Sequence, residues 1–399
     1  MVKSKLIDGI FPAKLELSPA QKQELGDLAD RLVAETMQAN ELFIANHRTL
    51  PREQWKLVKT REQVQVYRSR RSKCGDANGP QRPRLLSNNT VMERRTRVSG
   101  AATATSSPSE TGSFSVCDDT SILDQARPPH VPLIVATGVV KGTVEDVAYG
   151  SLANTERAWR LRAAYSPTED DPFHFLGVKW ATRDFNAFIK RRDFLFLEST
   201  GIALDWDGER VFYDLVHSIE LEQCPSLEGQ LGIVRCNLSI CKLSRQLDKS
   251  RIAVYCRGFT DPGQGVPESV GVSFMTTGVA SIANIVECSY LKKLAWAMET
   301  RAPRSGSGSR RSQTLDECVE CCVCGGNLTI LRSLLHTGSS CQICRRGICS
   351  KCTVHKKIIT SSMSHEAPPK HAPFCLPCVI DVNHATAWDI ALGEAVQSV

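Results

Sequence analysis

The sequence has no long apolar run, and this absence bears on where the protein works. Its longest uncharged stretch, Ser269 to Val286, is rich in Ser, Thr, Gly and Asn, which disfavours a membrane span. The N-terminal stretch MVKSKLIDGIFPAKLELSPA mixes charged residues into every part, so it lacks the apolar core of a signal peptide. We therefore expect a soluble cytoplasmic protein that can associate peripherally with endomembranes.

Familiar catalytic and nucleic-acid-binding motifs are missing as well. The chain has no G-x-S-x-G elbow, no Gly-rich phosphate loop and no H-E-x-x-H pair. Its basic stretches have no interleaved aromatic residues that could stack on bases, and no zinc finger of the C2H2 pattern occurs. We therefore predict a protein that is not an enzyme and has no nucleic-acid partner.

The composition is that of a globular protein with some basic segments. The chain has 399 residues, of which 42% are hydrophobic and 23% charged, so it can bury a large domain core and still form a small second unit. The net charge of +6 is concentrated in residues 52–97, with 13 Lys or Arg against four acids, and in residues 301–311. Such runs are usually solvated, and the functional alternatives are anionic lipid head groups or nucleic acid.

Hydrophobic periodicity and turn residues divide the chain into five parts. We predict an N-terminal helical segment at 1–50, in which Ser18 and Gln21 form a capping box. A domain at 51–300 follows, with a disordered Ser-, Gly-, Pro- and Arg-rich insertion at 70–128. The last three parts are a flexible basic linker at 301–317, a metal-binding finger at 318–382, and a C-terminal helix at 383–399 that packs on the finger or binds a partner.

The domain at 51–300 reads as α+β, with a curved antiparallel sheet closed by one long helix. Helical patterns span 144–162 and Glu268–Thr300, and the strand patterns cover 55–67, 131–143, 173–180, 194–204, 210–218, 232–243 and 252–260. Four short motifs occur along these strands: Arg192-Asp193-Phe194, His217-Ser218, Gly232-Ile233-Val234-Arg235, and Asp261 through Pro267. In this order they resemble the START domain, a lipid-transfer fold of the helix-grip type, over roughly residues 50–300.

The START resemblance implies an apolar cavity for a single lipid of unknown class. Within such a cavity Arg235 and Asp193 would orient the head group, although an Arg on a strand more often makes a structural ion pair. Two hypotheses stay open for this domain. Small residues and one buried charge in the tunnel would favour lipid binding or transfer, whereas bulky residues would favour an interaction scaffold with a filled fold.

Cysteine is the most unevenly distributed residue. Of 17 cysteines, ten lie within 61 residues, and eight of these form four C-x-x-C pairs. The pairs are separated by 16, four and 22 residues. Eight thiolates suit two tetrahedral Zn²⁺ ions, and so short a segment could hardly fold without metal. The predicted zinc ligands are Cys321, Cys324, Cys341, Cys344, Cys349, Cys352, Cys375 and Cys378. Cys318 forms a competing C-x-x-C pair with Cys321, and the other possible ligands nearby are Cys322, His336, His355, His365 and His371.

The spacing of CQICRRGICSKC is most similar to that of a FYVE-type zinc finger, although Arg345 stands where the family has glycine. The resemblance implies interleaved sites, with the first and third pairs on one zinc and the second and fourth on the other. The family's phosphoinositide-binding motifs are absent, which makes specific phosphoinositide binding unlikely and favours a membrane-associated protein partner. A ubiquitin-ligase finger is disfavoured because Cys344 stands where that class has histidine.

Overall fold

The fold was analysed in a computed structural model that describes residues 11, 15–70, 121–152, 164–165, 168–184, 189–263, 265–300, 320–328, 338–358 and 370–397. Its helices are α1 (Pro19–Ala45), α2 (Ile122–Ala126), α3 (Val144–Ser151), α4 (Glu228–Leu231), α5 (Glu268–Ala280), α6 (Ile285–Thr300), α8 (Leu376–His384), α9 (Ala387–Gln397) and the short 3-10 helices η2 (Ser281–Asn284) and η4 (Ser350–Cys352). The predicted linker at 301–317 lies outside the described residues.

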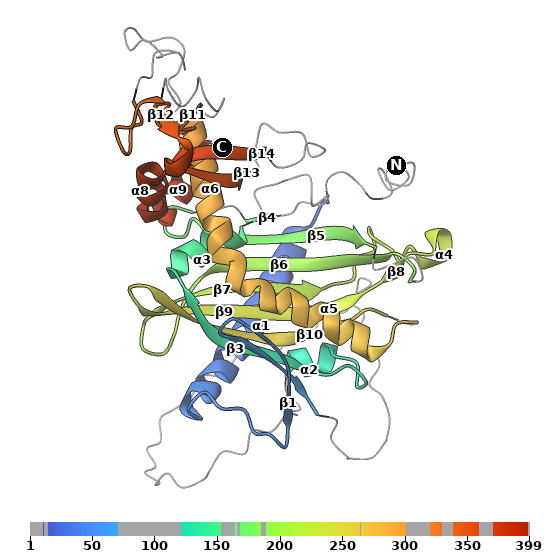
Figure 1. The fold of residues 1–399 in the computed structure, drawn as a ribbon. Helices are drawn as coiled ribbons and strands as arrows, with labels where there is room; N and C mark the ends of the chain where they lie inside the picture. The colour runs from blue at the N-terminus through green and yellow to red at the C-terminus, as the bar shows by residue number, and fades with distance from the viewer. Residues whose placement is uncertain are drawn as a thin grey trace.

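Most strands belong to one large antiparallel sheet, in the order β1-β2-β3-β10-β9-β7-β6-β5-β4 (Figure 1). A short strand β8 pairs with β6 in parallel. The strands are β1 (Trp55–Arg61), β2 (Val64–Ser69), β3 (Ile134–Lys141), β4 (Ala164–Tyr165), β5 (Phe175–Arg183), β6 (Arg192–Leu204), β7 (Arg210–Ser218), β8 (Val234–Arg235), β9 (Asn237–Asp248) and β10 (Arg251–Asp261). The chain is therefore α+β, as the sequence predicted.

The C-terminal cysteine-rich part of the chain, called here the module, comprises the described residues from 320 to 384 and contains two small hairpins and α8. β11 (Gly338–Ser340) pairs with β12 (Gly347–Cys349), and β13 (Thr353–Ile358) pairs with β14 (Lys370–Cys375). The module lies against the end of α6, which extends beyond the sheet toward it (Figure 1). α6 therefore belongs to both parts of the molecule.

Helices cover both faces of the sheet. α1 packs on one face, called here the α1 face, with Leu25, Leu32 and Phe43 in the same buried cluster as Leu195 and Leu197 of β6. α5 crosses the other face, the α5 face, and contacts β1, β2, β3 and β10. Because both faces are buried, apolar residues occupy both sides of the central strands.

The N-terminal helix begins where the sequence predicted. The Ser18 hydroxyl accepts a hydrogen bond from the backbone N–H of Gln21 at 3.2 Å, and the Gln21 side chain accepts one from the backbone N–H of Ser18 at 2.9 Å. Both halves of the capping box are thus formed, which satisfies two donors at the helix start. This prediction is confirmed.

The long helix predicted at Glu268–Thr300 is broken, so the prediction of one continuous helix was wrong. α5 and α6 are separated by η2 and differ in direction by 52°. The segment before the break contains Gly, Ser and Thr, which are weak helix formers, and the backbone of α6 contacts α3 closely directly after it. No single helix among the described residues is long and apolar enough to span a membrane, and only this bent pair passes such a test by length and composition.

The end of the predicted disordered insertion is ordered. Residues 71–120 lie outside the described residues, but α2 forms at 122–126 and packs beside α1. The Glu35 carboxylate on α1 accepts hydrogen bonds from the Ser121 hydroxyl at 2.5 Å and from the Ile122 backbone N–H at 2.9 Å. A carboxylate at the start of α2 anchors this helix, a contact that local composition could not reveal.

The C-terminal helix also differs from its prediction. The segment predicted as one helix at 383–399 that packs on the finger begins with the last residues of α8, and α9 starts at Ala387. The larger contacts of α9 are with α3 and α6. Its Ala387, Ile390 and Ala391 belong to the buried cluster of the α5 face, so the end of the chain helps to build the core of the α+β domain.

Candidate functional site

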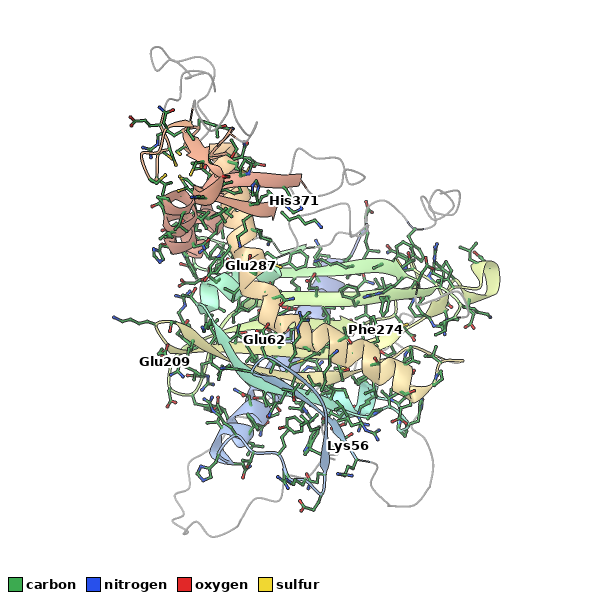
Figure 2. All side chains as sticks on the ribbon, viewed as in Figure 1. Lys56, Glu62, Glu209, Phe274, Glu287 and His371 are labelled. Carbon is green, nitrogen blue, oxygen red and sulfur yellow. The ribbon has the colours of Figure 1, made fainter. Side chains whose placement is uncertain are left out.

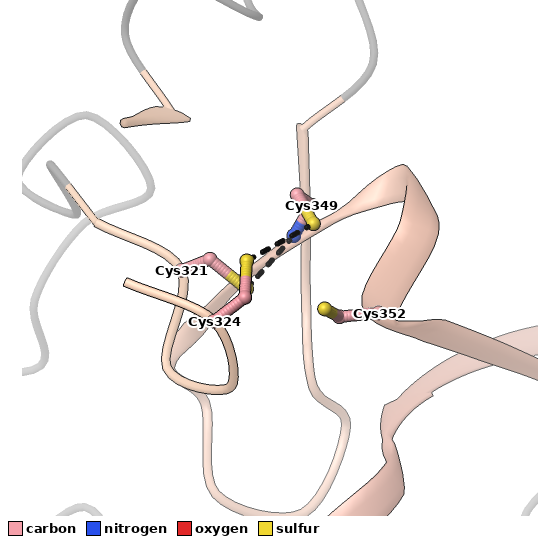
Figure 3. A group of neighbouring side chains, drawn as sticks. All are labelled: Cys321, Cys324, Cys349 and Cys352. Atoms are coloured by element: carbon pink, nitrogen blue, oxygen red, sulfur yellow. Dashed lines mark hydrogen bonds between the residues drawn. The ribbon is translucent and has the colours of Figure 1, made fainter. Parts of the chain in front are cut away.

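The structure brings eight cysteines into two groups of four. The first tetrad is Cys321, Cys324, Cys349 and Cys352, and the second tetrad is Cys341, Cys344, Cys375 and Cys378. Within each tetrad all sulfur atoms lie within 4.8 Å of one another. Figure 3 shows the four side chains of the first tetrad converging from two segments of the chain. These are the interleaved sets that the sequence resemblance implied.

The sulfur distances fit tetrahedral coordination of a metal ion. Cys324 Sγ and Cys349 Sγ are 3.8 Å apart in the first tetrad, and Cys344 Sγ and Cys375 Sγ are 3.9 Å apart in the second. Metal–sulfur bonds of about 2.3 Å place the sulfurs of a tetrahedral site about 3.8 Å apart. Both tetrads are therefore positioned to hold a metal ion.

Two similar backbone turns present the first cysteine pair of each tetrad. In the first turn the backbone N–H of Gly325 donates to the Cys321 carbonyl at 2.9 Å, and in the second that of Arg345 donates to the Cys341 carbonyl at 2.9 Å. Gly325 has φ 68° and Arg345 has φ 62°, so both occupy the left-handed region. Arg345 therefore adopts the same backbone conformation as Gly325 in the matching turn.

The thiols of each tetrad have sharply different proton affinities. Burial raises the pKa of Cys321, but backbone hydrogen bonds, including one from the Cys349 N–H at 3.4 Å, outweigh it and lower this pKa to about 6. Burial likewise raises the pKa of Cys344, but hydrogen bonds from the Arg346 backbone and side chain, together with those with Cys341 and Cys378, outweigh it and lower this pKa to about 7.

Other thiols in the same groups keep their protons more firmly. The hydrogen bond with Cys349 is the largest cause that raises the pKa of Cys352 to about 12, and burial raises the pKa of Cys378. Several thiolates this close repel one another unless a cation neutralises them. A set of four sulfurs whose full ionisation requires a cation suits a divalent, thiophilic metal.

The other candidate ligands of the module are not part of the two tetrads. Cys318 lies outside the described residues, and Cys322 belongs to neither group. His355 and His371 lie exposed on the β13–β14 hairpin (Figure 2). The module therefore reaches its two sets of four ligands with cysteine alone.

A small cavity opens between α5 and the sheet. Its volume is about 60 Å³, room for about four to six water-sized groups at ~10–15 Å³ each. Ile134 of β3, together with Val272 and Met275 of α5, contributes apolar walls. Thr260 also lines the cavity, and its buried hydroxyl has no hydrogen-bond partner within the part of the chain that the structure describes. The space thus combines apolar walls with one unsatisfied polar group.

Four charged side chains, called here the charged quartet, lie on the same face of the sheet. They are Lys179 of β5, Glu198 of β6, Asp214 of β7 and Lys242 of β9. Lys179 pairs with Glu198, and Lys242 Nζ lies 2.7 Å from Asp214 Oδ2. Strand register places Lys242 opposite Cys256, which belongs to the apolar cluster of the α5 face.

The two positive and two negative charges of the quartet offset each other beside apolar residues. Burial raises the pKa of Glu198, which outweighs the opposing effect of Lys179. Burial lowers the pKa of Lys242, but the neighbouring Asp214 carboxylate outweighs burial and the net shift is upward. Replacing a buried ion pair with apolar residues is often neutral or stabilising, so stability alone does not account for this one.

Arg235 and Asp193, predicted to orient a lipid head group, lie on the other face of the sheet. Arg235 Nε is 2.8 Å from Asp193 Oδ2, and the same oxygen accepts a hydrogen bond from Trp180 Nε1 at 2.9 Å. Trp180 belongs to the cluster of the α1 face. The two residues form a partly buried ion pair, and neither of them lines the α5-face cavity.

Sequence reasoning missed the quartet because both faces of the sheet are buried. Strand alternation separates the two faces of β6, with Phe194, Phe196 and Glu198 on one side and Leu195 and Leu197 on the other. With helices on each side, alternation cannot tell which face holds a cavity. The sequence feature that could have revealed the quartet is a charged residue within an otherwise apolar strand, such as Lys179 in FLGVKWATR.

The fold and its sites define a class: an α+β domain with helices on both sides of a large antiparallel sheet, joined to a two-site cysteine module. A scan of protein-family models gives no match, and neither does a search of curated proteins. Among solved structures, human StAR-related lipid transfer protein 5 matches at 16% identity and a TM-score of 0.36, over 65% of this chain and 96% of that one.

Two further solved structures are similar at the same level. Human STARD10 matches at 12% identity and a TM-score of 0.36, over 64% of this chain and 80% of that one. A STAR-related lipid transfer protein from Xanthomonas axonopodis matches at 12% identity and a TM-score of 0.34, over 59% of this chain and 98% of that one. At these values the matches assign no function to this chain.

Proposed function

We propose that this chain is a non-enzymatic protein that binds one lipid, for transfer or sensing, between α5 and the sheet. The observation that carries the proposal is that a small apolar cavity and buried polar groups lie on one face of the sheet; because a lipid is much larger than this cavity, α5 would have to move away from the sheet to admit it. Among the described residues the Thr260 hydroxyl has no hydrogen-bond partner, and the side chain of Lys242 keeps 26% of its surface accessible. Apolar surface would stabilise a bound lipid by roughly 25 cal/mol per Å² buried, and the polar groups would orient its head.

We also propose that the two tetrads each hold a Zn²⁺ ion, in a module of the FYVE type. Four thiolates at tetrahedral spacing suit zinc, and the zinc would hold together a segment with few large apolar residues. The departures from the family's head-group motifs favour a protein partner on an endomembrane over specific phosphoinositide recognition. The module would thereby recruit a cytoplasmic protein to a membrane surface.

Native mass spectrometry of the purified full-length chain tests both proposals. We expect a mass that exceeds the denatured mass by two zinc ions and one lipid-sized adduct. Fewer than two zinc ions would contradict the assignment of the tetrads. Two zinc ions without any adduct, after incubation with mixed phospholipid and sterol vesicles, would contradict lipid binding.

A matched pair of variants locates the lipid. Val272 lines the cavity, whereas its neighbour Ser273 is exposed on α5. Val272→Trp fills the cavity, so we expect the adduct to fall at least tenfold in abundance. Ser273→Trp places the same ring outside it and should leave the adduct unchanged. Equal lipid loading of the two variants would place the lipid elsewhere.

A scaffold with a filled α+β domain is the second candidate function. The observation in its favour is the packing of Phe194 against Phe274 of α5, with ring centroids 6.3 Å apart, beside Phe196 and Leu238. Phe274 lies where α5 crosses the sheet (Figure 2). These large side chains occupy part of the space between helix and sheet. In this case the native mass would show zinc alone, and the module would act by binding proteins.

A further inference from the structure

A buried lysine joins the metal-binding module to the α+β domain. Lys293 of α6 is 2% exposed, and its ammonium lies 2.7 Å from Asp146 Oδ1 of α3. The same nitrogen donates to the backbone carbonyls of Ala385 at 2.7 Å and Asn383 at 3.3 Å, at the C-terminal end of α8. All three ammonium hydrogens therefore have acceptors, one in the domain and two at the end of α8.

The partners of Lys293 are themselves fixed in place. Asp146 accepts hydrogen bonds from the Ser289 hydroxyl at 3.0 Å and from the Thr143 hydroxyl at 2.9 Å. The carbonyl end of a helix attracts positive charge, so an ammonium at the end of α8 is favourable. Loss of either Lys293 or Asp146 would leave the charge of the other buried without an opposite charge, which proteins tolerate poorly.

The other end of α8 carries two ligands of the second tetrad. Cys375 is the N-terminal cap of α8, and Cys378 lies in its first turn. A helix of nine residues is too short to persist alone in water. Metal binding to these cysteines would thus stabilise the helix whose far end binds Lys293.

The chain then returns from α8 to the α+β domain through α9. Trp388 packs edge-on against Phe173, with ring centroids 5.5 Å apart, and Glu394 accepts a hydrogen bond from the Tyr149 hydroxyl at 2.9 Å. The apolar residues of α9 share one buried cluster with Ile134 and Met275, which line the α5-face cavity. The metal-binding module and the cavity are therefore connected through continuous packing.

We propose that the second tetrad, with its metal bound, holds α8 and α9 against the α+β domain through Lys293, so that metal binding and lipid binding favour each other. The lipid half of this proposal rests on the proposed function, whereas the structural half does not. A metal that binds the docked state more tightly shifts the molecule toward it, and a ligand of the docked cavity must raise metal affinity by the same factor.

The test removes metal from the full-length wild-type chain with a chelator. Native mass spectrometry counts the ions, alkylation identifies which tetrad has opened, and hydrogen exchange reports on the helices. When the second tetrad opens, we expect exchange in α3 and α9 to rise at least tenfold. Lipid-loaded protein should lose this ion several-fold more slowly than lipid-free protein.

A pair of Lys→Met variants tests the contacts that Lys293 makes with Asp146 and with the end of α8. Lys293→Met removes the ammonium, and we expect the second tetrad to lose its ion at least tenfold faster while the first tetrad keeps the wild-type rate. Lys356→Met is the control, because Lys356 also links the module to α6, at 2.7 Å from Glu287, but that pair is exposed and should contribute little (Figure 2).

The outcomes separate this proposal from the proposed function. Unchanged exchange in α3 and α9 after the second tetrad opens would overturn the proposal, and so would a wild-type rate of metal loss in Lys293→Met. A chain that never carries lipid but shows the coupling would refute lipid binding and support the structural half. The chelation experiment uses the wild-type chain, so it remains decisive if Lys293→Met does not fold.

Discussion

Arg345 occupies a backbone conformation that costs an L-amino acid free energy. Its φ of 62° equals, within a few degrees, the 68° of Gly325 in the matching turn of the first tetrad. The left-handed conformation costs a residue with a Cβ about 1–2 kcal/mol, and glycine avoids this cost. Arg345→Gly should therefore stabilise the second tetrad by up to about 1 kcal/mol, once the greater freedom of glycine in the unfolded chain is deducted.

The reciprocal variant at Gly325 serves as the control. A Cβ on Gly325 would contact none of the described residues within 4 Å, so Gly325→Ala changes chiefly the backbone preference. We expect it to destabilise the first tetrad by about 1 kcal/mol. Chelator-driven metal loss, followed separately for each tetrad, measures both effects. Faster loss from the second tetrad in Arg345→Gly would show that the arginine side chain contributes more than its conformation costs.

His217 gives the α+β domain a specific sensitivity to acid. It is 7% exposed on β7, and Nδ1 lies 2.9 Å from the Ser239 hydroxyl. Burial lowers its pKa from 6.5 to about 4. Between these values the unfolded chain binds the proton more strongly than the folded chain, so stability decreases as the pH falls from 6.5 to 4. At about 1.4 kcal/mol per pH unit the loss is on the order of 3 kcal/mol.

Replacing His217 with glutamine isolates this contribution, because glutamine can retain a hydrogen bond and does not titrate. We expect the free energy of unfolding of His217→Gln to fall less than that of wild type between pH 6.5 and pH 4. Urea unfolding at intervals across this range provides the measurement. Parallel pH profiles for the two proteins would contradict a buried neutral histidine.

At the scale of elements, the approach of α3 to α6 accounts for the break in the long helix. Gly150 of α3 lies so close to α6 that a Cβ on it would overlap the Ile285 carbonyl oxygen. Gly150→Ala must separate the two helices, and we expect a loss of at least 2 kcal/mol, typical of an overpacked core. Urea unfolding monitored by circular dichroism measures the loss.

Gly278 of α5 provides the matched control for Gly150→Ala. It is exposed, and a Cβ there would meet nothing within 4 Å. Gly278→Ala should stabilise the protein by about 0.5–1 kcal/mol, because alanine is the better helix former. If both substitutions had the same sign, helix propensity rather than the α3–α6 contact would explain the effect at Gly150.

Local sequence patterns predicted where most helices and strands lie, but not where the chain turns within a predicted strand. The strand at Arg210–Ser218 has its predicted bounds, whereas the strand predicted at 55–67 is a hairpin of β1 and β2 that turns at Glu62, with φ 52°. The strand predicted at 232–243 similarly separates into β8 and β9. Alternation continues through such turns when the same face stays buried, so periodicity alone does not reveal them.

At the scale of the molecule, the module and the α+β domain are held together by buried packing. Leu294 and Ala297 of α6 share one buried cluster with Phe374, Val379 and Val382 of the module. α9 then returns to the other core. The coupling tested through Lys293 belongs to this scale, because no single element contains both the metal ligands and the cavity.

The cysteine spacing identified all eight members of the tetrads because ligand chemistry is local: two thiolates three residues apart on a tight turn already present half of a tetrahedral site. The α+β class and the capped start of α1 followed from equally local patterns. Contacts between residues far apart in the chain decide which face carries the charged quartet, the pairing of Asp193 with Arg235, and the return of α9 to the domain core. These contacts depend on which helices pack on each face of the sheet. Hydrophobic periodicity shows that a face is buried, but it does not show which distant segment buries it.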